Sequence, residues 1–156
     1  MALFFHKKRT LSVIDEVKDF IQNDLFISKT AYGRGERNVE EKLVCQLKER
    51  FGDYPVRSQL QGSDKLKCDV DLFDKGCGIE LKLASSLEGK ADEFQRAIGQ
   101  IACYVHEDYK DTGVILLVVG EHEEMSEKLE KLKSIVKHFR GVHFLYKQAL
   151  YKKPNK

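Results

Sequence analysis

The segment from Lys67 to Leu83, KCDVDLFDKGCGIELKL, carries the residues of this chain whose types and spacing best suit chemistry. Polar and apolar residues alternate on both sides of Lys75-Gly76, a pattern typical of a β-hairpin. One face is apolar: Cys68, Val70, Leu72, Ile79, Leu81 and Leu83. The other face gathers acids beside lysine: Lys67, Asp69, Asp71, Glu80 and Lys82.

The turn length decides which of these acids meet. A two-residue turn at Lys75-Gly76, or a four-residue loop of the same register, predicts Asp71 opposite Glu80 and Asp69 opposite Lys82, with Cβ atoms about 5 Å apart. A three-residue loop would separate Asp71 and Glu80 onto opposite faces. Asp69 opposite Lys82 is an ordinary ion pair, whereas Asp71 opposite Glu80 is destabilising unless a proton or a cation lies between them.

A divalent cation resolves this repulsion. Two carboxylates with open water positions suit Mg²⁺, whose remaining positions a substrate phosphate can complete. Lys82 shares the face of Glu80 and would orient a water molecule or stabilise charge that develops on phosphate. The alternative is a solvated sheet face on which the charges have no role beyond solubility.

Composition sets the broad class. The 156 residues, 33% charged with a net charge of +2, predict one globular domain. No apolar run is long enough to span a membrane, and the four scattered cysteines are expected to be reduced thiols in a cytoplasmic protein. The net charge is low for a dedicated nucleic-acid binder, so any basic surface must be local, as at 6–9, 65–67 and 152–153.

Hydrophobic periodicity predicts the elements around the hairpin. Helices are expected over 13–21, from after Arg37 to Phe51, over 91–107 and over 123–139, and further strands within 54–62, 113–120 and 141–146. Residues 85–92 are expected to form a polar connection. Three strands followed by two helix–strand units imply an α/β fold with a central mixed sheet of about five strands flanked by helices.

This arrangement resembles the restriction-endonuclease-like, or PD-(D/E)XK, nuclease superfamily. Its Glu-x-Lys motif matches Glu80 and Lys82, and its preceding acid matches Asp71, with Asp69 as the alternative. The family glutamate on the preceding helix matches Glu40, ahead of the weaker candidates Glu36 and Glu41. A Gln-x-x-x-Tyr motif of some members matches Gln100 and Tyr104. The proline that often precedes the family aspartate is missing.

The resemblance covers about residues 36–120 and implies the roles of the site residues. Asp71 (or Asp69), Glu80 and the Leu81 carbonyl would bind Mg²⁺ or Mn²⁺, and Lys82 would act on the attacking water. Glu40 would hold a second metal or a water molecule, and Gln100 and Tyr104 would steady the site. The nucleic-acid contacts would come from Arg96, Lys67 and Lys90. The N-terminal helix and the last helix and strand would be additions to this nuclease-like core within a single domain, 1–156.

The activity that the resemblance implies is metal-dependent hydrolysis of phosphodiester bonds, in DNA before RNA, by an endo- or exonuclease of repair, recombination or defence. The first alternative is a nuclease-fold module that binds nucleic acid or a protein partner without cleaving. The second is a plain α/β interaction protein with a charged hairpin. Since many nucleases of this family act as dimers, the resemblance also allows a homodimer.

Overall fold

A computed structural model describes residues 13–58, 68–74 and 76–155 of the chain. Six helices and five strands follow one another in this part. The helices are α2 (Val13–Asn23), α3 (Lys29–Arg34), α4 (Glu36–Arg50), α5 (Ala84–Gly89), α6 (Ala91–His106) and α7 (Glu127–Val136). The strands are β1 (Val56–Ser58), β2 (Val70–Leu72), β3 (Cys77–Leu83), β4 (Val114–Gly120) and β5 (Val142–Gln148).

The five strands form one mixed sheet in the order β1-β2-β3-β4-β5. The first three strands are antiparallel neighbours, and β3, β4 and β5 run parallel to one another. The prediction of a mixed sheet flanked by helices is therefore confirmed. Neighbouring strands follow in chain order because an antiparallel meander needs only short loops and each parallel pair has a helix between its strands.

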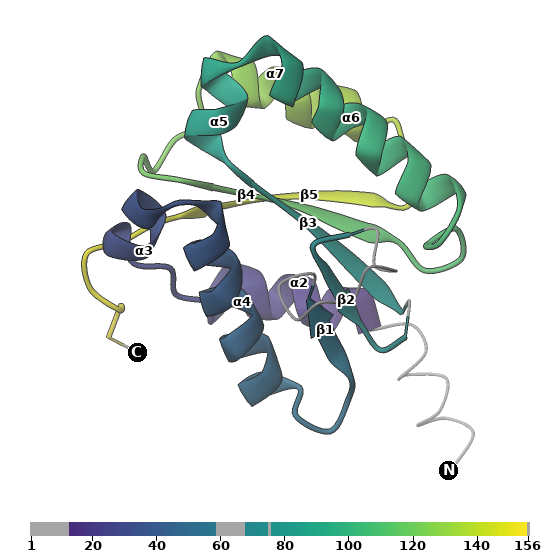
Figure 1. The fold of residues 1–156 in the computed structure, drawn as a ribbon, viewed down its shortest axis with the longest axis horizontal. Helices are drawn as coiled ribbons and strands as arrows, with labels where there is room; N and C mark the ends of the chain where they lie inside the picture. The colour runs from purple at the N-terminus through teal and green to yellow at the C-terminus, as the bar shows by residue number, and fades with distance from the viewer. Residues whose placement is uncertain (1–12, 59–67, 75, 156) are drawn as a thin grey trace.

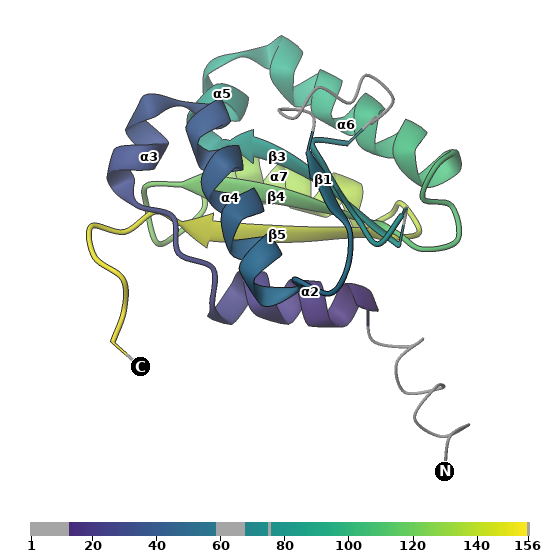
Figure 2. The same ribbon diagram turned by 60° about the horizontal axis from the view of Figure 1, so that its bottom comes forward.

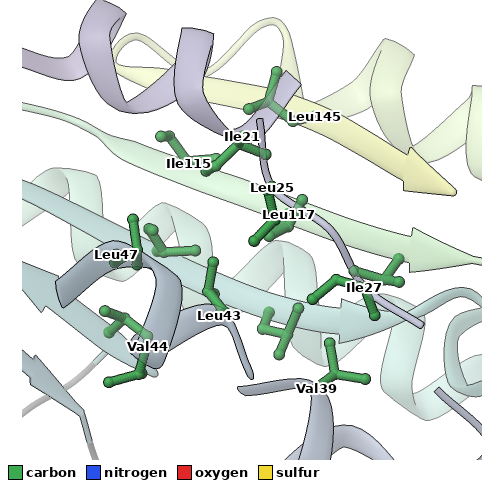
Figure 3. Packing of buried hydrophobic residues seen from close by; sticks show 14 of the residues in the cluster. Ile21, Leu25, Ile27, Val39, Leu43, Val44, Leu47, Ile115, Leu117 and Leu145 are labelled. Carbon is green, nitrogen blue, oxygen red and sulfur yellow. The ribbon is translucent and has the colours of Figure 1, made fainter. Parts of the chain in front are cut away.

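Helices cover both faces of this sheet (Figure 1). On one side lie α2, α3 and α4, and Figure 2 shows α2 along β5 with α4 crossing in front of the strands. Apolar residues of α2, of the segment after it and of α4 meet the sheet in one continuous core. In Figure 3 the side chains of Ile21, Leu25, Ile27 and Leu43 lie against Leu117 and its neighbours.

The opposite face carries α5, α6 and α7 over a second core. Leu87, Ala97 and Ile101 from the helices pack there on Leu116 and Val118 of β4, and all five are fully buried. Strand β4 is buried on both faces along its whole length, which is why residues 114–119 are apolar without alternation. None of the helices in the described ranges is both long and apolar enough to cross a membrane.

Two short helices differ from the expectation. Residues 29–34 form α3, capped by the Ser28 side chain, which accepts a hydrogen bond from the Ala31 amide. Gly35, at φ 109°, then lets the chain turn directly into α4. The expected polar connection over 85–92 begins instead as α5, held by the burial of Leu87. Within 54–62, β1 covers only Val56–Ser58, and residues 59–62 lie outside the described part.

The register expected for the hairpin is wrong by two residues. Leu72 pairs with Cys77 and Asp71 with Gly78, around a four-residue loop from 73 to 76. The Phe73 ring explains the shift, because it packs edge-on against Phe51 and Tyr54, with ring centroids 5.8 and 4.8 Å apart. Phe73 leaves the strand with φ at 61°, and the turn therefore begins there. A shift of two keeps every side chain on its expected face, so Asp69, and not Asp71, comes beside Glu80.

Candidate functional site

The candidate site lies at the edge of β3, just past the end of its pairing with β2. The two strands pair only through Val70–Leu72, whereas β3 continues to Leu83. Where the backbone pairing stops, the Asp69 carboxylate accepts a hydrogen bond of 2.8 Å from the Leu81 amide in place of a backbone carbonyl of β2. Since the amide and carbonyl of a strand residue point to the same side, the Leu81 carbonyl faces this edge too.

Glu80 and Lys82 project from β3 on one face, two residues apart. Their neighbours on β4 are Leu116 and Val118, and both charged residues are buried, at 3% and 7% exposure. The Lys82 Nζ lies 3.5 Å from Glu80 Oε1. The other oxygen, Oε2, is buried and has no hydrogen-bond partner among the described residues. A buried carboxylate oxygen without a partner is costly, so Glu80 is a candidate ligand, and a bound cation would supply the missing partner.

Helix α4, on the face of the sheet opposite α6, contributes two more acids, Glu40 and Glu36. Glu40 is buried and accepts a hydrogen bond of 3.2 Å from the Ser58 hydroxyl. Glu36 is half-buried one turn earlier, close enough to Lys82 and Asp69 for their charges to act on it. Glu41 is exposed and pairs instead with Arg37 at 3.7 Å, so it lies away from the site.

The acids of this cluster hold protons strongly. Burial, and then the charge of Asp69, raise the pKa of Glu80 to about 8. The same two causes raise the pKa of Glu40 to about 7. Burial also raises the pKa of Asp69, although the Leu81 amide and Lys82 oppose the rise. Asp69 lies close to both glutamates, and the raised pKa values of Glu80 and Glu40 favour their protonated forms near neutral pH, so a divalent cation would have to displace those protons.

Helix α6 places Tyr104 over Glu80. Tyr104 is buried, and its pKa is raised by burial and by the Glu80 carboxylate beside its hydroxyl. Gln100 lies one turn earlier on the same helix, with its Oε1 buried and without a hydrogen-bond partner in the described ranges. The expected i, i+4 pair is therefore present on a helix, and its tyrosine lies close to Glu80 of β3.

The expected nucleic-acid contacts stand farther out. Arg96 has a side-chain exposure of 63%, and its Nη1 lies 3.4 Å from Glu93 Oε1. Lys90 is exposed at the start of α6. Lys67 lies outside the described residues. Glu93 acts electrostatically on Glu36, so the first turns of α4 and α6 approach each other near the site.

Asp71 has a different environment from the one expected of it. It is fully buried, and its Oδ1 accepts a hydrogen bond of 2.6 Å from the Tyr109 hydroxyl. Its Oδ2 lies 3.1 Å from Arg57 Nη2, which also reaches the exposed Asp74 at 3.2 Å. Both carboxylate oxygens of Asp71 thus have protein partners. Asp71 lies two residues after Asp69, away from the cluster around Glu80.

A cation held at this cluster would have to be one that keeps most of its water. No group of three or more His, Cys, Asp or Glu side chains within 13–58, 68–74 and 76–155 is arranged as a metal-binding set. Mg²⁺ needs only one or two carboxylates beside water and substrate oxygens. Asp69 and the unpartnered Glu80 oxygen supply that donor set.

Three residues near the site are not among the strong sequence candidates. Glu36 precedes Glu40 by one helical turn, and that spacing is the signal for it. Ser58 alternates with Val56 on β1, but nothing in the sequence pairs it with Glu40. Tyr109 follows α6 by three residues, and no local pattern connects it to Asp71.

Comparisons with protein-family models, with curated proteins and with solved structures found no match to this chain.

The two aspartates can be separated by paired variants. Asp69→Asn removes a charged group beside Glu80. It is expected to weaken Mn²⁺ binding by about 100-fold, the upper end of the effect of removing a residue that supports metal ligands. Asp71→Asn keeps an acceptor for Tyr109 and is expected to change Mn²⁺ affinity far less. Calorimetric titration of both variants at one pH measures this difference. Equal losses, or a larger loss in Asp71→Asn, would return the ligand role to Asp71.

Proposed function

We propose that this protein is a metal-dependent nuclease that hydrolyses phosphodiester bonds in nucleic acid, with DNA as the first substrate to test. The observation that carries the proposal is the buried Glu80–Lys82 pair on β3, past the end of its pairing with β2. One Glu80 oxygen has no hydrogen-bond partner among the described residues, and Asp69 lies beside it. An ion pair buried only for stability would have its remaining oxygen hydrogen-bonded, since burial without a partner is destabilising.

Asp69 and Glu80, with the Leu81 carbonyl, would hold Mg²⁺ or Mn²⁺. When bound, the metal ion polarises the scissile phosphate and lowers the pKa of a coordinated water molecule. Glu40 is a further carboxylate beside Asp69, and the Ser58 hydroxyl donates a hydrogen bond to it. With its pKa near 7 it can accept a proton from water or help to hold a second cation.

Lys82 supplies the positive charge for the reaction. The water oxygen forms a bond to phosphorus while the bond from phosphorus to the leaving oxygen breaks, and negative charge develops on the phosphoryl oxygens. The Lys82 ammonium, 3.5 Å from Glu80, is positioned to stabilise that charge. Tyr104 would hold the Glu80 carboxylate in orientation, and Arg96 and Lys90 would contact phosphates outside the site.

The proposal is tested by incubating the protein with linear, supercoiled, single-stranded and branched DNA and with RNA, each with Mg²⁺, Mn²⁺ or EDTA. Cleavage of at least one substrate that needs the metal and stops in EDTA is expected. Mn²⁺ binding without cleavage of any substrate would favour the non-cleaving nucleic-acid or protein-binding module. Neither binding nor cleavage would overturn the proposal.

A further inference from the structure

The buried carboxylate of Asp71 belongs to a hydrogen-bond network that the proposed chemistry does not use. This Asp71 network consists of Arg57 on β1, Asp71 on β2 and Tyr109 after α6, joined by contacts of 3.1 and 2.6 Å. Asp71 and Tyr109 are 0% and 3% exposed. It therefore connects the edge strand β1 and its neighbour β2 to the segment that follows the C-terminal end of α6.

Tyr109 lies directly on the backbone of β3. A Cβ atom on Gly78 would stand 2.8 Å from Tyr109 Cζ and 2.8 Å from Cys68 Sγ, closer than real Cβ contacts allow. Glycine at 78 is thus what lets the tyrosine ring and the cysteine sulfur lie against the strand. Gly78 shares its face of the strand with Glu80, so the ring stands next to the candidate site.

The network reaches two site residues through short paths. The Tyr109 amide donates a hydrogen bond of 2.9 Å to the Tyr104 carbonyl, so holding Tyr109 also holds the end of α6 that carries Tyr104. Cys68, packed at Gly78, immediately precedes Asp69. Fixing Tyr109 over Gly78 therefore restrains Asp69 from one side and Tyr104 from the other.

We propose that Asp71, Tyr109 and Gly78 are positioning residues, which hold Asp69 and Tyr104 in place against Glu80 through the Tyr109 ring seated on β3. Catalytic groups must keep their geometry closely, since a displacement of about 1 Å can cost 10²-fold in rate. This role rests on the proposed function for its catalytic consequence, but its structural part, the restraint on Asp69, is independent of any activity.

The structure offers a matched control at the other end of the sheet. The Tyr146 hydroxyl donates a hydrogen bond of 2.6 Å to the His122 carbonyl, and the Tyr146 ring lies against Gly120 of β4. Tyr146 and Gly120 repeat the arrangement of Tyr109 and Gly78, outside the Asp71 network. Tyr146→Phe removes the same hydroxyl group as Tyr109→Phe, and Gly120→Ala adds the same methyl group as Gly78→Ala.

The first measurement is amide hydrogen exchange in the metal-free protein. The Leu81 amide reports on Asp69 because it donates to the Asp69 carboxylate. Tyr109→Phe is expected to speed its exchange by about tenfold relative to that of Leu117 in β4, which reports on the sheet as a whole. Gly78→Ala, which displaces the ring without touching the hydroxyl, is expected to do the same. Tyr146→Phe and Gly120→Ala should leave the ratio unchanged.

The second measurement is Mn²⁺ affinity by calorimetry in the same four variants. Tyr109→Phe and Gly78→Ala are each expected to raise the Mn²⁺ Kd by about tenfold, which is the lower end of the effect of removing a residue that supports metal ligands. The two control variants should keep the wild-type Kd. Should Tyr109→Phe not fold, Gly78→Ala alone decides. Exchange at Leu81 that responds no more to the network variants than to the controls would overturn the positioning role. Wild-type protein that fails to bind Mn²⁺ would instead overturn the proposed function, with the exchange result still valid.

Discussion

Lys82→Ala is expected to reduce phosphodiester cleavage by about 10²–10³-fold, the usual loss when a group that stabilises developing charge is removed. Lys82 lies within ion-pair distance of Glu80, and it is 7% exposed. Because lysine is not a metal ligand here, Mn²⁺ affinity at pH 8.5 should change much less than the cleavage rate. Single-turnover cleavage and calorimetric Mn²⁺ titration of the same preparation measure the two effects separately.

Two further variants complete this test. Glu80→Gln is expected to lose both cleavage and Mn²⁺ binding, because the neutral amide keeps the shape of the side chain but not its charge. Lys147→Ala is the control, since Lys147 is a half-buried strand lysine on β5 that donates to the Gln22 carbonyl. Cleavage that persists in both Lys82→Ala and Glu80→Gln would place the activity at another site or in a contaminant.

In metal-free protein, thermal stability is expected to fall as the pH rises from 5.5 to 8.5. Glu80 has a pKa of about 8 in the folded protein against an ordinary value of 4.5, and Glu40 has one of about 7. Between these values the folded state binds more protons than the unfolded state, so raising the pH removes stability. The loss from Glu80 alone should be about 3 kcal/mol, which lowers Tm by roughly 6–12 °C for a domain of this size, and Glu40 adds to it in the same direction.

Glu80→Gln isolates the contribution of the site from the other titrating groups. His143 acts in the opposite direction, because burial lowers its pKa and its protonation destabilises the folded protein at low pH. As the pH rises from 5.5 to 8.5, the Tm of wild type should therefore fall more than the Tm of Glu80→Gln. Equal slopes for the two proteins would contradict the raised pKa of Glu80.

Bound metal should offset much of this loss of stability at high pH. A divalent cation needs the carboxylates deprotonated, so its stabilising effect on Tm should be larger at pH 8.5 than at pH 5.5. At a concentration about 100 times its Kd, one bound ion adds about 2.7 kcal/mol. Differential scanning fluorimetry with Mn²⁺ or with EDTA at the two pH values measures the effect.

Much of the fold could be predicted from local pattern. The helical stripe of 13–21 and the alternation along 77–83 have the periods of the elements they form, and the short uninterrupted apolar run of 114–119 is typical of a strand buried on both faces. Mixed pairing followed because short connections favour antiparallel neighbours and helical connections favour parallel ones. Helices α3 and α5 could not be predicted in this way, since six-residue helices have too few turns to show a period.

The hairpin shows where local pattern ends. Alternation places Asp69, Asp71, Glu80 and Lys82 on one face, and a register shift of two residues leaves that unchanged. Which acid meets Glu80 depends on where the turn begins, and Phe73 decides this by packing on Phe51, a residue 22 positions earlier in the chain. No pattern within the hairpin contains that contact.

The sequence by itself therefore determined the types of the site residues, the face of β3 that carries Glu80 and Lys82, and the helix spacing of Gln100 and Tyr104. The tertiary structure alone decided that Asp69 stands beside Glu80, that Ser58 holds Glu40, and that Asp71 joins Arg57 and Tyr109. The physical reason is distance along the chain. Periodicity arises within one element and is legible in its residues, whereas these contacts join elements whose mutual placement depends on the packing of both cores.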